Sequence, residues 1–114
     1  RMKDFYDIYY LARTFDFEGA KLQAAIFETL QRRGTSYDSD SFKRIARLVE
    51  DIDIQKRWRY FLKNVKDDTL EFLTVIKELQ VFLEPVFEAI LHEEEWLYLW
   101  KSEEKSWRNS INEG

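Results

Sequence analysis

Three charged residues near the start of the chain have the types and spacing of a catalytic cluster. Lys3, Asp4 and Asp7 lie within about one helical turn of one another if this segment is a helix, so their side chains can reach one site. A charged face ahead of an apolar face is typical of a helix that lines an active site. It is equally typical of a solvated first turn, where the helix dipole favours acidic residues.

A second candidate site is the segment from residue 43 to residue 66, which carries eight basic residues against three acidic ones. Basic side chains interleaved with Trp58 and Tyr60 could bind phosphates and stack on bases, as RNA-binding surfaces do. The alternative is a solvated helix surface, with Trp58 on the core side and basic stems covering apolar groups. The candidate nucleic-acid-binding residues are Lys43, Arg44, Arg47, Lys56, Arg57, Arg59 and Lys63.

The composition excludes several other chemistries. The 114 residues include no cysteine and one histidine, His92, which argues against disulfides, cysteine catalysis and a His-rich zinc site. Gly-rich phosphate loops, Gly-x-Ser-x-Gly elbows and His-Glu-x-x-His motifs are absent from the sequence. The pair Asp67-Asp68 is expected at a helix N-cap or an exposed face, so we expect no metal site.

No stretch of the sequence approaches about 18 consecutive apolar residues, and no signal-peptide pattern is present at its start. We therefore expect a cytoplasmic protein with no membrane contact. The net charge of -4 argues against a generally basic coat for nucleic acid, and leaves only local basic surfaces.

Helical periodicity and the scarcity of Gly and Pro predict an all-α fold, an irregular bundle of about five helices in one domain over residues 1–114. No segment has the pattern of a strand. Asp16 or Thr14 would cap the second helix, and Ser39 or Asp40 the third. The first four helices are expected over residues 3–13, 18–33, 42–50 and 54–65.

The longest helix should begin near Asp67 or Asp68 and form the backbone of the core. Pro85 lies inside its apolar stripe, where it removes one N–H donor and crowds the carbonyl four residues earlier. We expect a kink near Phe82 or a break just before Pro85. The aromatic segment from residue 96 to residue 107 would pack back onto the bundle or become mobile near its end.

Five sequence blocks follow one another in an informative order. They are Arg1-x-Lys3-Asp4-Phe5-Tyr6-Asp7-Ile8-Tyr9, Phe15-Asp16, Gln31-Arg32-Arg33-Gly34-Thr35, Trp58-x-x-Phe61-Leu62 and Phe82-Leu83-x-Pro85-Val86. In content and order these blocks resemble the C-terminal part of the nucleotidyl transferase AbiEii/AbiGii toxin family. The resemblance covers nearly the whole chain, and the acidic aromatic segment after His92 carries least of it.

The resemblance implies a two-part enzyme of the DNA polymerase β-like nucleotidyltransferase superfamily, the toxin of bacterial toxin–antitoxin or phage-defence pairs. In some members the nucleotide is transferred onto tRNA. The family's Gly-Ser motif, Asp-x-Asp carboxylates and catalytic lysine are absent here, and the chain begins on Arg1 rather than Met. We therefore expect the C-terminal half of a larger enzyme, inactive and cofactor-free alone, with Mg²⁺ and NTP held by the missing N-terminal half.

By the same resemblance, Asp4 would be the late catalytic aspartate that faces the nucleotide, with Asp7 as the second candidate. Lys3 or Arg1 would lie near the phosphates. These are sensible roles, because nucleotidyl transfer depends on positioning and on countering developing charge. The basic segment would contact tRNA, another face could meet an antitoxin, and an uncovered first helix could make the fragment a homodimer.

A function of another class is a stand-alone helical module for protein–protein interaction. Exposed aromatic side chains commonly anchor such interfaces, and burial of these side chains in the bundle would remove that role. The candidate anchors are Tyr6, Tyr10, Trp96, Trp100 and Trp107.

Overall fold

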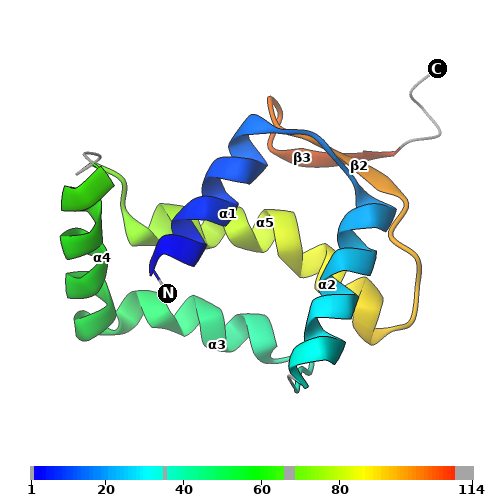
Figure 1. Ribbon diagram of the computed structural model, residues 1–114, viewed down its shortest axis with the longest axis horizontal. Coiled ribbons are helices and arrows are strands. Elements are labelled where there is room, and N and C mark those ends of the chain that lie inside the picture. The colour runs from blue at the N-terminus through cyan, green and yellow to red at the C-terminus, as the bar shows by residue number, and fades with distance from the viewer. Residues whose placement is uncertain (1, 35, 66–68, 110–114) are drawn as a thin grey trace.

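The computed structural model describes residues 2–34, 36–65 and 69–109. The helix start expected at Asp67 or Asp68 lies outside these ranges, as do Arg1, Thr35 and Lys66. The described chain is mostly helical, as predicted, with a short 3₁₀ turn, η1 (Leu48–Glu50), between its third and fourth α-helices (Figure 1). The α-helices are α1 (Met2–Thr14), α2 (Gly19–Arg33), α3 (Ser41–Arg47), α4 (Ile52–Val65) and α5 (Phe72–Leu91).

Helix α5 is the centre of the fold, as its apolar sequence predicted. Helices α1, α2 and α3 all pack against it, and Figure 1 shows them arranged around it. Helix α4 joins the same core through Trp58 and Leu62, which are both buried. The buried side chains of α5 are Phe72, Val75, Ile76, Leu79, Phe82, Val86, Ala89 and Ile90.

The expected break before Pro85 is wrong, because α5 continues through this residue to Leu91. Val86 and Ile90 are buried beyond the proline, so packing holds the last turns in place although one ladder hydrogen bond is missing. The indole Nε1 of Trp107 donates a hydrogen bond of 3.0 Å to the carbonyl oxygen of Phe82. A donor from outside the helix thus binds a backbone carbonyl group in the turn where Pro85 removes a hydrogen bond.

The prediction of a purely helical fold is also wrong, because three short strands form an antiparallel sheet in the order β1-β2-β3. They are β1 (Phe17–Glu18), β2 (Tyr98–Lys101) and β3 (Ser106–Asn109). Trp100 lies opposite Phe17 on one side and opposite Trp107 on the other. The aromatic segment therefore packs back onto the bundle as a hairpin, which was one of the two alternatives that its sequence allowed.

Packing of aromatic rings explains why this hairpin forms. Trp100 is only 2% exposed, and its ring centroid lies 4.7 Å from that of Phe82 and 5.3 Å from that of Trp107. Its Nε1 donates a hydrogen bond of 2.7 Å to the carbonyl oxygen of Ala12, so the buried donor is satisfied. The hairpin is thereby attached to both α5 and the last turn of α1.

Asp16 does not cap α2 as expected but ties the α1–α2 connection to the hairpin turn. Its Oδ1 accepts a hydrogen bond of 2.8 Å from the backbone N–H of Ser102. This hydrogen bond, helped by the Ser102 side chain and the charge of Lys101, lowers the pKa of Asp16 below its ordinary value. The residue before α2 is Glu18, whose side chain makes no capping hydrogen bond.

Truncation of Trp100 tests the role of the aromatic cluster. We expect Trp100→Ala to lower the free energy of unfolding by about 3–5 kcal/mol, because it removes a buried indole and leaves a cavity. Urea unfolding followed by far-UV circular dichroism measures this change. Leu97→Ala, at a neighbouring side chain that is 56% exposed, is the control and should change stability little. Equal effects of the two substitutions would contradict the buried position of Trp100.

Titration tests the contact between Asp16 and Ser102. Because the pKa of Asp16 is lowered in the folded state, its stabilising contribution is present above the ordinary value of 3.8 and is lost as pH falls below it. The stability difference between the wild type and Asp16→Asn should therefore be largest near neutral pH and shrink in acid. Urea unfolding from pH 7 to pH ~3 checks this, with Glu103→Gln as the control in the same turn. A difference independent of pH would contradict the contact.

Candidate nucleic-acid interface

The first turns of α1 bring together two of the three predicted catalytic residues. The Nζ of Lys3 lies 2.6 Å from Oδ2 of Asp7, one turn further along the helix. The hydrogen bond to Asp7, reinforced by its charge, raises the pKa of Lys3 above its ordinary value. The Lys3 side chain is 75% exposed, so this ion pair fixes a position more than it stabilises the fold. Asp4 is exposed on the same turn.

A groove of about 470 Å³ runs between the start of α1 and the outer face of α4. It places Lys3 beside Lys56 and Arg57, which are more than fifty positions away in the sequence. The described lining residues include these three cations and no carboxylate. The described lining residues are Met2, Lys3, Lys56, Arg57, Tyr60, Phe61 and Asn64.

Trp58 and Tyr60, the two aromatic residues considered for base stacking, have opposite environments. Trp58 is 2% exposed, and its Nε1 donates a hydrogen bond of 2.8 Å to the carbonyl oxygen of Leu70. It therefore belongs to the core, as the alternative interpretation held, and cannot stack on a base. Tyr60 is 72% exposed, because residues two positions apart on a helix do not share a face.

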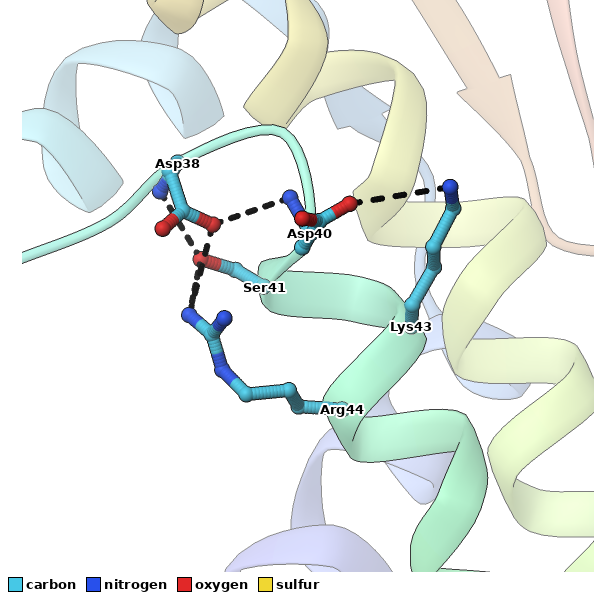
Figure 2. Close-up of polar contacts among 5 residues, drawn as sticks. All are labelled: Asp38, Asp40, Ser41, Lys43 and Arg44. Atoms are coloured by element: carbon cyan, nitrogen blue, oxygen red, sulfur yellow. Dashed lines mark hydrogen bonds and ion pairs between the residues drawn. The ribbon is translucent and has the colours of Figure 1, made fainter.

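Lys43 and Arg44 lie at a different place, at the start of α3 and at the end of that helix remote from α4 (Figure 1). Figure 2 shows both side chains next to carboxylates. Arg44 Nη2 lies 3.3 Å from Oδ1 of Asp38, and Lys43 Nζ lies 3.6 Å from Oδ1 of Asp40. These two cations are thus partly neutralised.

The remaining predicted cations are exposed but do not share the groove. Arg59 lines a separate hollow of about 520 Å³ with Gln55 and Leu73, while Arg47 and Lys63 line neither hollow. The seven cations therefore do not form one continuous surface. Lys56 and Arg57 are the two that the fold brings next to α1.

The sequence pattern Asp-x-x-Ser at the start of α3 was missed and has a structural role. The Asp38 carboxylate accepts a hydrogen bond of 2.9 Å from the backbone N–H of Asp40, and the Ser41 hydroxyl accepts one of 3.0 Å from the N–H of Asp38 (Figure 2). This reciprocal pair has the arrangement of a capping box. The side chain of Asp40 makes no capping hydrogen bond, so Asp38 does what Ser39 or Asp40 was expected to do.

The predicted exposed aromatic surface is wrong for most of its members. Trp100 is buried, and Tyr6, Trp96 and Trp107 are only partly exposed. Tyr10 alone of the five candidates is largely exposed, at 56%. The hairpin and the core use the other four rings for packing, so Tyr10 is the one largely exposed anchor left to the interaction module.

The described ranges contain neither a cluster of metal-ligating side chains nor a membrane-spanning helix. Within residues 2–34, 36–65 and 69–109, no three or more His, Asp or Glu residues gather so as to hold a metal ion. Among the helices of the same ranges, none is long and apolar enough to cross a membrane. The pair Asp67-Asp68 lies outside these ranges.

A helical protein with a cation-lined groove beside a charged first turn has the electrostatic character of proteins that act on phosphate-containing substrates. The family described as "Nucleotidyl transferase AbiEii toxin, Type IV TA system" matches residues 1–93. The chain belongs to this family of toxin-type nucleotidyl transferases, which confirms the resemblance. Comparison with curated proteins and with solved structures gives no match. The family match ends before the β2–β3 hairpin.

Removal of the Asp38 carboxylate tests the capping arrangement. We expect Asp38→Ala to lower the free energy of unfolding by about 1 kcal/mol, because the N–H of Asp40, immediately before α3, loses its acceptor. Urea unfolding measures this change, and Ser39→Ala in the same loop is the control. An equally large effect of Ser39→Ala would mean that the wrong residue has been assigned as the cap.

Proposed function

We propose that this chain is the helical domain of a larger AbiEii-type nucleotidyltransferase toxin, which transfers a nucleotide from NTP to RNA, with tRNA as the expected acceptor. The observation that carries the proposal is the groove in which Lys3 of α1 meets Lys56 and Arg57 of α4. It joins the helix expected at the catalytic centre to the helix expected to hold nucleic acid. Membership of the toxin family supports this assignment and implies an antitoxin for the system.

In this proposal the two carboxylates at the start of α1, Asp4 and Asp7, have different roles. Asp7 accepts a hydrogen bond from Lys3 and so positions an ammonium group at the rim of the groove. Asp4 is exposed on the same turn and is the carboxylate that we assign to the reacting nucleotide. A carboxylate there can orient the attacking hydroxyl group, while Lys3 counters phosphate charge.

Mg²⁺ and NTP are assigned to another part of the enzyme. Among the described residues no group of three or more His, Asp or Glu side chains gathers so as to hold a metal ion, and no step is assigned to the metal here. This division is tested by the reading frame upstream of the codon for Arg1. A Gly-Ser turn, an Asp-x-Asp pair and a later lysine in that frame would support the two-part enzyme, and a start codon close to Arg1 without them would overturn it.

Substitution of Asp4 tests its catalytic role. In the enzyme that contains this chain and its catalytic half, we expect Asp4→Ala to lower NTP-dependent labelling of RNA by at least about a hundredfold. Incorporation of radiolabelled nucleotide into RNA measures the loss, with unfolding by urea as a check of stability. Glu103→Ala, an exposed residue beyond the family match, is the matched control. Full activity of Asp4→Ala with loss in Asp7→Ala would transfer the role to Asp7.

A further inference from the structure

We propose that the groove between α1 and α4 holds an unpaired nucleotide at the end of the RNA that accepts the transfer, with its base stacked on Tyr60 and its phosphates against Lys56 and Arg57. This proposal rests on the proposed function, because it names the part of the acceptor that the site recognises. It assigns a role to Tyr60, a residue that the enzyme chemistry does not need.

The ring of Tyr60 is free to stack. It is 72% exposed, and no described residue makes a hydrogen bond or ring contact with it. Its neighbour Trp58 is buried in the core, and Phe61 is partly buried, with its ring centroid 5.6 Å from that of Trp58. A large aromatic side chain left uncovered beside cations is the usual platform for a nucleic-acid base.

The cations lie where phosphates on either side of a stacked base would pass. Lys56, Tyr60 and Asn64 occupy successive turns on one face of α4, each about 6 Å along the helix axis from the last. Arg57 lies one turn before Tyr60 and also lines the groove. Neither Lys56 nor Arg57 has an ion-pair partner among the described residues, in contrast to Lys43 and Arg44.

The side chains that line the groove favour an unpaired nucleotide over a duplex. Stacking on a side chain requires a base whose face is open, which a paired base inside a helix does not offer. Met2 and Phe61 supply an apolar surface suited to a base, and no carboxylate among the described lining residues repels a phosphate. Lys3 shares the groove, so the held nucleotide would lie next to the turn that carries Asp4.

Binding measurements on the 114-residue chain test this inference. The probe is a fluorescein-labelled RNA duplex with a short single-stranded 3′ overhang, compared by anisotropy with the blunt duplex. We expect tighter binding of the overhang, and Tyr60→Ala should weaken it about tenfold while Tyr60→Trp retains it. Tyr10→Ala removes another exposed tyrosine, which lies outside the groove, and is the matched control. Lys56→Gln should reduce the dependence of affinity on salt by about one counterion.

Three results would overturn the inference. They are equal affinity for the blunt and overhanging duplexes, unchanged binding by Tyr60→Ala, and displacement of the RNA by free NTP that itself requires Tyr60. The last would assign the groove to the donor nucleotide. Circular dichroism of each variant shows that loss of binding is not loss of fold.

Failure of this inference can be told apart from failure of the proposed function. Binding is measured on the chain alone and NTP-dependent labelling on the whole enzyme, so the two readouts are separate. If RNA binding does not depend on Tyr60 but labelling still depends on Asp4, the nucleotide site in the groove is wrong and the proposed enzyme activity stands. If RNA binding depends on Tyr60 but the enzyme has no labelling activity, the nucleotide site stands and the proposed enzyme activity is wrong.

Discussion

The rest of the structure depends on the buried apolar face of α5. Phe72, near its start, contacts Phe5 of α1 at 5.4 Å and Trp58 of α4 at 5.2 Å between ring centroids. Phe82, about 15 Å further along the helix axis, contacts Trp100 of the hairpin at 4.7 Å. One end of this face therefore gathers α1 and α4, and the other end holds the hairpin. The groove exists because two helices far apart in sequence pack around the same phenylalanine.

The parts of the fold that repeat regularly could be predicted from the sequence, and the parts that depend on single backbone conformations could not. Helices α1, α2 and α4 begin and end close to their predicted limits, since apolar spacing decides them. The hairpin was missed because its strands are short and its turn contains no Gly, Asn or Pro. Lys105 in that turn has a φ of 52° and Glu93 after α5 has a φ of 56°. Lys and Glu seldom adopt a positive φ, so their presence in the sequence does not predict these conformations.

The sequence identified charged residues for the candidate site but not how they are arranged in space. Counting charges along the segment from residue 43 to residue 66 suggested one group of cations, whereas in the structure Lys43 and Arg44 lie apart from the groove and pair with Asp40 and Asp38. The proximity of Lys3 to Lys56 and Arg57 follows from tertiary packing, which no spacing along the chain encodes. Helical periodicity alone, by contrast, was enough to favour a buried Trp58 and could have indicated an exposed Tyr60.

The hairpin lies beyond the family match, yet it bears on the site through α1. Trp100 donates to the carbonyl oxygen of Ala12, and Arg13 makes two hydrogen bonds, of 2.9 and 3.0 Å, to Glu78 of α5. The last turn of α1 is thus held from two sides, while Phe5 holds its first turns against Phe72. A helix fixed at both ends keeps its charged first turn at a constant distance from α4. Such preorganisation is what a site that works by positioning requires, so under the proposed function the hairpin helps to place the charged first turn of α1.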